Sequence, residues 1–102
     1  MSYDTYYRLT TDPPVVSFGD EKVDRGFIRV DALVAGGAEH CSWSNHEADM
    51  RALSRRYPHV LFTLSGAGEE GGDLWRKYFR DGRMQVVHAR IEYPEFDPEK
   101  LS

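Results

Sequence analysis

The chain has 102 residues, of which 13 are basic and 17 acidic, and its formal net charge is −4. This length predicts a single domain, residues 1–102, and the acidic balance does not favour a nucleic acid or an anionic membrane as a partner of the whole surface. The chain has a single cysteine, Cys41, and no signal-peptide pattern, which predicts a cytoplasmic protein. It has no long apolar run, so we expect no membrane segment.

The N-terminal half predicts short strands and one region that fits two structures. Residues 3–11 are rich in Tyr and Thr, which favour a strand, and Pro13 and Pro14 end it. Residues 27–34 fit both the alternation of a strand and the apolar stripe of a helix, and we favour the strand. Residues 38–43 predict another short strand.

The clearest element is a helix over residues 45–57. It begins with a capping-box pattern, in which the Ser44 hydroxyl and the Glu47 carboxylate each accept from the other residue's backbone N–H. Acidic residues stand early in this segment and arginines late, which suits the helix dipole, and Pro58 ends it. One apolar stripe follows the helical spacing and predicts the buried face: His46, Met50, Leu53 and Tyr57.

The C-terminal half predicts three strands, residues 59–65, 74–79 and 83–93. Combined with the strand and helix before them, they predict the fold class. We expect an α+β fold: an antiparallel sheet of four or more strands with the helix at 45–57 packed on one face.

The last two strands form a hairpin whose register depends on the length of its loop. A two-residue Asp81-Gly82 loop pairs Phe79 with Met84 and leaves both faces half apolar. A three-residue loop that also includes Arg80 shifts the pairing by one residue and gives one apolar face, which a one-sided sheet needs. We expect the three-residue loop, which groups Trp75 and Phe79 with Val87, Ala89, Ile91 and Tyr93.

A literal G-x-G-x-x-G pattern occurs at Gly66, Gly68 and Gly71. In a dinucleotide-binding loop this pattern joins a strand to a helix whose N-terminus faces the pyrophosphate. Here a strand follows, and nearby acidic residues would repel phosphate. We therefore expect a solvated connection between two strands and no cofactor, with a candidate acidic interaction loop formed by Glu69, Glu70 and Asp73.

Residues 41–93 resemble a known family. A tryptophan, Trp43, stands before the helix, and "YPHVLFTLSGAGEEGGDLWRKYFRDGRM" follows it with an acidic glycine loop, an aromatic strand and a D-G turn. This pattern resembles the YubB ferredoxin-like domain family of plasmid and phage proteins. His59 stands where that family often has an acid, and residues 12–38 lie outside the match. The resemblance implies a ferredoxin-like sheet and a mobile-element origin, and it implies no reaction.

Chemistry-bearing side chains are few. Zinc needs three or four ligands at tetrahedral reach, and the scattered histidines beside one cysteine are a weak signal, so we expect no metal. Cys41 precedes the helix, a position that can lower a thiol pKa, but no base or oxyanion site is marked beside it. A small cysteine-dependent enzyme is therefore our third interpretation, and we predict that the chain is not an enzyme.

One hairpin is basic in an otherwise acidic chain. From Arg76 to Arg90 there are five basic residues and one acid, Asp81. The alternative function is therefore a nucleic-acid-binding module over residues 74–93, with tyrosine stacking on bases and arginines on phosphates. The candidate contact residues for a partner or a nucleic acid are Arg76, Tyr78, Arg80, His88 and Arg90.

Our leading prediction is a phage or plasmid accessory protein that acts by protein–protein interaction. The partner would be a host protein, for example a defence protein that it inhibits, or a second copy of the chain. A homodimer would use apolar side chains of the N-terminal half that the helix cannot cover, with Phe18, Phe27 and Trp43 as its candidate surface.

Overall fold

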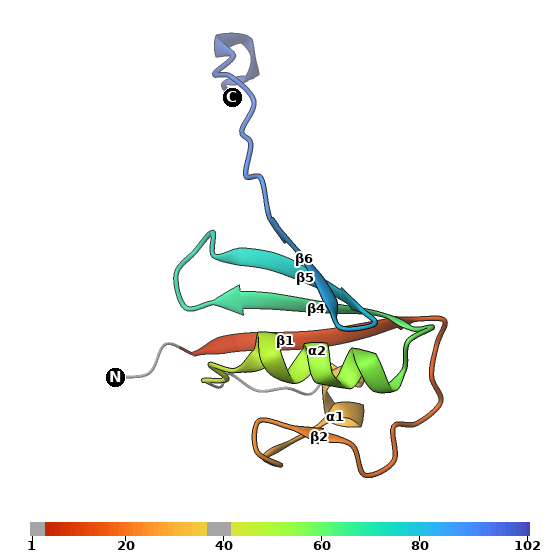
Figure 1. The fold of residues 1–102 in the computed structure, drawn as a ribbon. Coiled ribbons are helices and arrows are strands. Elements are labelled where there is room, and N and C mark those ends of the chain that lie inside the picture. Colours follow the sequence, from red (N-terminus) through yellow and green to blue (C-terminus); the bar gives the residue numbers. More distant parts are fainter. Residues whose placement is uncertain (1–3, 37–41) are drawn as a thin grey trace.

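The computed structural model describes residues 4–36 and 42–102, and within them the chain forms two layers (Figure 1). One layer is a four-stranded antiparallel sheet in the order β1 (Thr5–Asp12), β4 (Leu61–Gly68), β5 (Leu74–Arg80) and β6 (Arg83–His88). Helix α2 (His46–Arg56) packs on one face of this sheet. The predicted α+β class is confirmed, and an antiparallel sheet with a helix on one face is consistent with a ferredoxin-like arrangement. The four strands of this sheet lie side by side in chain order.

Smaller elements pack beside β1 and α2. They are a two-stranded sheet, β2 (Lys22–Val23) and β3 (Ile28–Arg29), followed by the short helix α1 (Val30–Val34). The predicted strand at 27–34 is therefore wrong after its first residues. Val30 and Leu33 are both fully buried, and the three-residue step between them places them on one face of a helix. Of the predicted strand at 38–43, residues 38–41 lie outside the described part and residues 42–43 are not in a strand.

The predicted helix at 45–57 is confirmed, although its expected cap is not. Met50 and Leu53 are fully buried and the two ends of the stripe are half-buried, as the periodicity indicates. Asn45 occupies the N-cap position and no side chain makes a capping hydrogen bond. Glu47 instead pairs with Lys77 of β5, whose ammonium lies 2.9 Å from the carboxylate, so a tertiary ion pair replaces the capping box.

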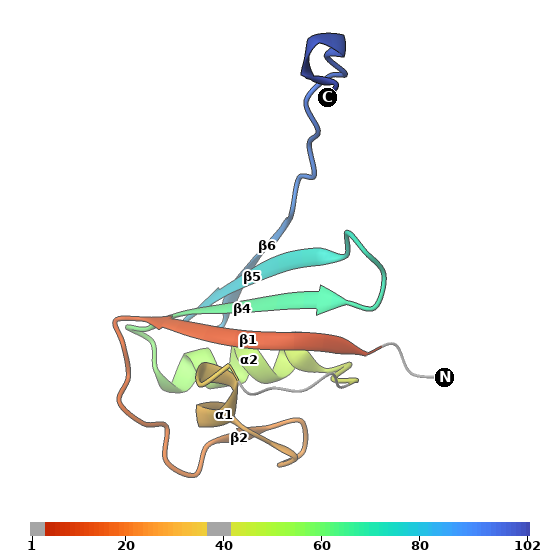
Figure 2. The same cartoon turned by 180° about the vertical axis from the view of Figure 1, so that it is seen from behind.

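Alternation along the strands separates a helix-facing side from an open side. The core lies between the sheet and α2, where Leu9 pairs with Leu64 and Phe62 with Phe79, all of them fully buried. In Figure 2, seen from behind, the sheet lies in front of α2 and turns its other side to the viewer. The helix therefore covers one side of the sheet only.

The hairpin between β5 and β6 has the two-residue loop, so the expected three-residue loop is wrong. Asp81 and Gly82 both have positive φ, 50° and 78°, which is the backbone of the primed turn that two-residue hairpins favour. Phe79 consequently pairs with Met84, and Trp75 with His88. Trp75 and Phe79 face α2, whereas Val87 lies on the open side.

The strand predicted at 83–93 ends at His88. The Ala89 N–H still donates to the Leu74 carbonyl, at 2.9 Å, but Leu74 is the first residue of β5 and the ladder stops there. Residues 89–102, which we call the tail, leave the sheet and extend away from it in both views (Figures 1 and 2). Ile91 and Tyr93 belong to this exposed tail and not to the core.

Ser54 joins α2 to the hairpin turn. Its hydroxyl is fully buried, donates to the Arg51 carbonyl at 2.9 Å and accepts from the Gly82 N–H at 2.8 Å. The Arg51 guanidinium also donates to the Gly82 carbonyl at 3.3 Å. The helix therefore holds the hairpin in place through the backbone of one turn residue.

Ser54→Ala should destabilise the fold by about 1–3 kcal/mol, because it leaves the buried Gly82 N–H without its acceptor. Urea unfolding followed by circular dichroism measures the loss. Ser44→Ala is the matched control, since Ser44 makes no capping hydrogen bond, and it should change stability by less than about 0.5 kcal/mol. Equal losses in the two variants would contradict the assigned role of Ser54.

Candidate functional site

The side of the sheet that faces away from α2, which we call the open face, carries the alternate residues of all four strands. None of the elements that the structure describes covers it. Its polar and aromatic members come mainly from β1, β5 and β6, while β4 supplies smaller side chains. Its main members are Tyr6, Arg8, Thr10, Thr63, Ser65, Leu74, Arg76, Tyr78, Arg80, Arg83, Gln85 and Val87.

Four arginines give this face its charge. Arg8, Arg76, Arg80 and Arg83 are exposed, and none has a hydrogen-bond or ion-pair partner in the part of the chain that the structure describes. Arg80 and Arg83 stand directly opposite each other beside the turn. Like charges opposite each other across a ladder destabilise a sheet, and a bound anion removes that repulsion.

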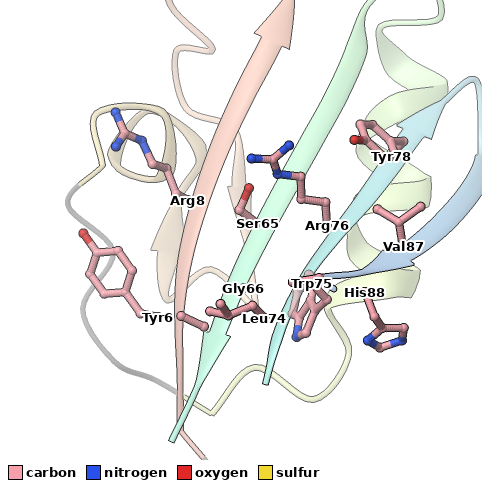
Figure 3. A pocket seen from close by; sticks show the side chains of 12 residues that line it. Tyr6, Arg8, Ser65, Gly66, Leu74, Trp75, Arg76, Tyr78, Val87 and His88 are labelled. Atoms are coloured by element: carbon pink, nitrogen blue, oxygen red, sulfur yellow. The ribbon is translucent and has the colours of Figure 1, made fainter. Parts of the chain in front are cut away.

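A row across the sheet places two of these arginines on either side of a hydroxyl. Ser65 pairs with Arg8 on one side and with Arg76 on the other. Because neighbouring strands are about 4.8 Å apart, the two arginine backbones are about 10 Å apart. In Figure 3 the Arg76 guanidinium extends over β4 toward the Ser65 hydroxyl, whereas the Arg8 side chain extends outward past β1.

These residues line a pocket of about 560 Å³ on the open face (Figure 3). Its floor is partly apolar, because Leu74, Val87 and Ala89 line it beside Tyr78. Tyr6 lines it from β1, and its hydroxyl donates to the Gly36 carbonyl at 2.7 Å. The pocket therefore combines cationic donors, two phenol rings and apolar surface, a set that suits a flat anionic ligand.

The open face contains some of the predicted contact residues and not others. Arg76, Tyr78 and Arg80 alternate along β5 and lie on it together, as predicted. His88 pairs with Trp75, so it belongs to the helix-facing alternation at the end of β6, although it also lines the pocket. Arg90 lies in the tail.

Arg8, Tyr6 and Arg83 also belong to the open face, and sequence reasoning did not include them. The alternation of polar and apolar residues in the first strand was a signal for Arg8. Its neighbour across the sheet, Ser65, is 57 positions away in the chain, so only the pairing of β1 with β4 reveals the row.

The candidate acidic loop lies at one end of the sheet, between β4 and β5. Glu69 and Glu70 are exposed, and the Glu69 carboxylate accepts from the Asp4 N–H at 3.1 Å. The Asp73 carbonyl accepts from the Gly68 N–H at 2.8 Å, and the Asp73 N–H donates to the Glu70 carbonyl. The loop connects two antiparallel strands, as predicted, and backbone hydrogen bonds that the sequence did not indicate hold it together.

The predicted dimer surface of Phe18, Phe27 and Trp43 is wrong, because two of its members are core residues. Phe18 is 4% exposed and Trp43 is 1% exposed, whereas Phe27 is 83% exposed. Phe18 packs edge-on against Tyr57. The Trp43 indole N–H donates to the Asp49 carboxylate at 2.8 Å, which satisfies its polar group inside the core.

A second cluster lies on the helix-facing side, around His46. Its Nδ1 lies 2.8 Å from the Trp43 carbonyl and donates to it, so Nε2 is the acceptor for the Lys77 ammonium. The imidazole stacks on the Trp75 indole, with centroids 5.2 Å apart. Burial, with a further effect of the Lys77 charge, lowers the pKa of His46 below its ordinary value of 6.5, although the Trp43 carbonyl opposes this.

Stability should therefore fall as the pH drops below about 6.5 and through the lower pKa of folded His46. In this window the unfolded chain binds more protons than the folded chain, so acid favours unfolding. Urea titrations from about pH 8 to about pH 5 measure the slope, and His46→Gln should flatten it. An unchanged slope in the variant would show that His46 does not carry this dependence.

The glycine pattern joins β4 to β5 without an intervening helix, so it lacks the helix N-terminus that a dinucleotide loop uses. Within residues 4–36 and 42–102, no three His, Cys, Asp or Glu residues are grouped so that they could hold a metal ion. Cys41, the candidate nucleophile, lies outside these residues. The described helices include none that is long and apolar enough to cross a membrane.

Comparisons with family models, with curated proteins and with solved structures found no significant match to this chain. The resemblance of residues 41–93 to the YubB ferredoxin-like domain therefore stays a prediction.

Proposed function

We propose that the chain binds single-stranded nucleic acid on its open face. The main observation is that the open face carries four arginines without partners in the described part of the chain, two of which, Arg8 and Arg76, line a pocket with tyrosine rings. Arginine donates to phosphate oxygens in a fixed fork, and the exposed rings of a sheet stack on bases that are not paired in a duplex. We therefore favour nucleic-acid binding, the alternative predicted from the sequence, over protein binding.

The separation of charge within the molecule supports this choice despite the net charge of −4. The four arginines of the open face are accompanied by one acidic residue of the same alternation, Asp12, at the end of β1. Most acidic residues lie elsewhere, for example in the 66–73 loop and the tail. A ligand at the surface responds to the local field within about 8–10 Å and not to the total charge.

Single strands fit this face better than a duplex. The open face is a sheet surface and carries no helix that enters a major groove. Tyr78 lies between Arg76 and Arg80 along β5, so a base on its ring places the neighbouring phosphates near cations on either side. Tyr78 is the stacking residue of the proposal, and Arg8 and Arg76 hold phosphate groups.

Fluorescence anisotropy with a labelled single-stranded oligonucleotide tests the proposal. If the four arginines contact four phosphates, affinity should fall about 50-fold between about 50 and 200 mM salt. A duplex probe of the same sequence should bind more weakly. Equal affinity for both probes, or binding that does not respond to salt, would contradict the proposal.

The exposed apolar side chains of the tail favour a second candidate, the protein-binding accessory role predicted from the sequence. Ile91, Tyr93, Phe96 and Leu101 are all more than half exposed, in a segment with little structure of its own. Such segments bind partner proteins when they order on a surface. Capture of a protein from host lysate that is lost with Phe96→Ser, while oligonucleotides fail to bind, supports this role instead.

A further inference from the structure

We propose that the open face of one chain receives the tail of a second copy, so that the protein forms a dimer by exchange of tails. The proposal uses the surface assigned above to nucleic acid and adds a competitor for it. Its occupant is residues 92–99 of the partner copy. It also replaces the surface of the N-terminal half as the site of the expected homodimer.

The aromatic side chains of the tail are exposed on their own chain. The tail leaves the sheet after β6 and extends beyond the β6 side of the sheet in both views (Figures 1 and 2). Tyr93 is 87% exposed and Phe96 is 75% exposed, although aromatic side chains of this size gain about 1.5–3 kcal/mol each by burial. Pro94 and Pro98 flank the second aromatic residue and keep this stretch from joining a regular helix.

Charge complementarity connects the tail to the open face. Residues 92–99 contain four carboxylates and no basic residue: Glu92, Glu95, Asp97 and Glu99. The open face presents four arginines that have no acidic partner within the described chain. Opposite charges that meet at an interface direct the association and fix the register of the segment.

Length and apolar surface also match. Residues 92–99 would span about 26 Å if fully extended, and the seven residues of β5 span about 23 Å, so the segment could follow the strand from end to end once the 3-10 helix at Pro98–Lys100 opens. The apolar pocket floor formed by Leu74 and Val87 offers a site for one aromatic ring of the tail. Reciprocal exchange buries two such contacts in one closed dimer with twofold symmetry.

Charge reversal in two separate chains tests the exchange, measured as mass by light scattering at low salt and without nucleic acid. The face variant is Arg76→Glu with Arg80→Glu, and the tail variant is Glu95→Lys with Asp97→Lys. All four side chains are on the surface and not in the core, so both variants should fold. The wild type should be dimeric at high micromolar concentration, each variant alone monomeric, and their equimolar mixture dimeric again.

Three outcomes overturn the proposal. A wild type that stays monomeric rules out the dimer, and variants with the mass of the wild type rule out this interface. A chain that carries all four reversals should also be a dimer, and a monomeric mass for that variant would show that the tail docks on its own chain.

Wild type that binds oligonucleotide but stays monomeric refutes only the exchange, whereas a charge-dependent dimer that binds no oligonucleotide refutes only the proposed function. Lys22→Glu, on β2, is the control and should leave the mass unchanged.

Discussion

Gly66→Ala should destabilise the fold by about 3 kcal/mol, because the added methyl group would overlap the Trp75 indole. A Cβ at Gly66 would lie 2.2 Å from the Trp75 indole, closer than any real contact. The indole is held on its other sides, since it stacks on His46 and meets the Tyr7 ring edge-on at 6.0 Å. The ring therefore has to move and lose these contacts. Urea unfolding followed by tryptophan fluorescence measures the change.

Gly71→Ala is the matched control within the same glycine pattern. No atom lies within 4 Å of a Cβ at Gly71, and its φ is not in the left-handed region. It should change stability by less than about 0.5 kcal/mol. A similar loss in both variants would mean that Gly66 is needed for something other than the close approach of Trp75.

Arg8→Glu with Arg76→Glu should lower the affinity for a single-stranded oligonucleotide by about 100-fold or more. Each change removes a charge-assisted hydrogen bond to phosphate, worth about 1.5–3 kcal/mol, and adds a repelling carboxylate. The two residues flank Ser65 in one row of the sheet, so the loss should exceed that of either single variant. Anisotropy titrations at low salt measure both affinities.

Lys22→Glu makes the control, because Lys22 is an exposed cation on β2, away from the open face. It should lower the affinity by less than about threefold, through the net charge alone. Equal losses from Lys22→Glu and from either arginine variant would indicate a diffuse charge effect and would reject the open face as the site.

The helix at 45–57 could be predicted because its signals are local. The spacing of Met50 and Leu53 and the stop at Pro58 lie within one segment, and burial follows directly from the period. The capping box was also a local pattern, but a tertiary contact takes its place in the structure. Glu47 pairs with Lys77 of β5, a residue 30 positions away, and no pattern within the helix reveals that partner.

The register of the last hairpin shows where the rule of one apolar face fails. Asp-Gly favours the two-residue turn, and that turn is present even though it places Lys77 on the helix-facing side. Lys77 is tolerated there because Glu47, His46 and the Trp75 ring surround its ammonium. The geometry of the Asp81-Gly82 turn set the register, and the contacts of Lys77 compensated the burial of its charge. The preference for one apolar face therefore predicted the register less well than the turn sequence did.

Only part of the candidate site could be predicted from local sequence patterns. Arg76, Tyr78 and Arg80 could be grouped from the sequence, because alternation within one strand is local. Arg8 joins them only through the pairing of β1 with β4, which brings distant parts of the chain together. Phe18 and Trp43 were assigned to a surface because nothing in the sequence marks the second layer, with β2, β3 and α1, that covers the N-terminal apolar residues.

An NMR titration of the ¹⁵N-labelled chain with a short oligothymidylate tests the central claim most directly, because it locates the ligand residue by residue. Amide shifts should change along one side of the sheet, at Arg8, Ser65, Arg76 and Tyr78, and should stay unchanged on the buried face of α2, at Met50 and Leu53. Shifts confined to the tail or to α2, or no shifts at saturating oligonucleotide and low salt, would contradict the open face as the binding surface.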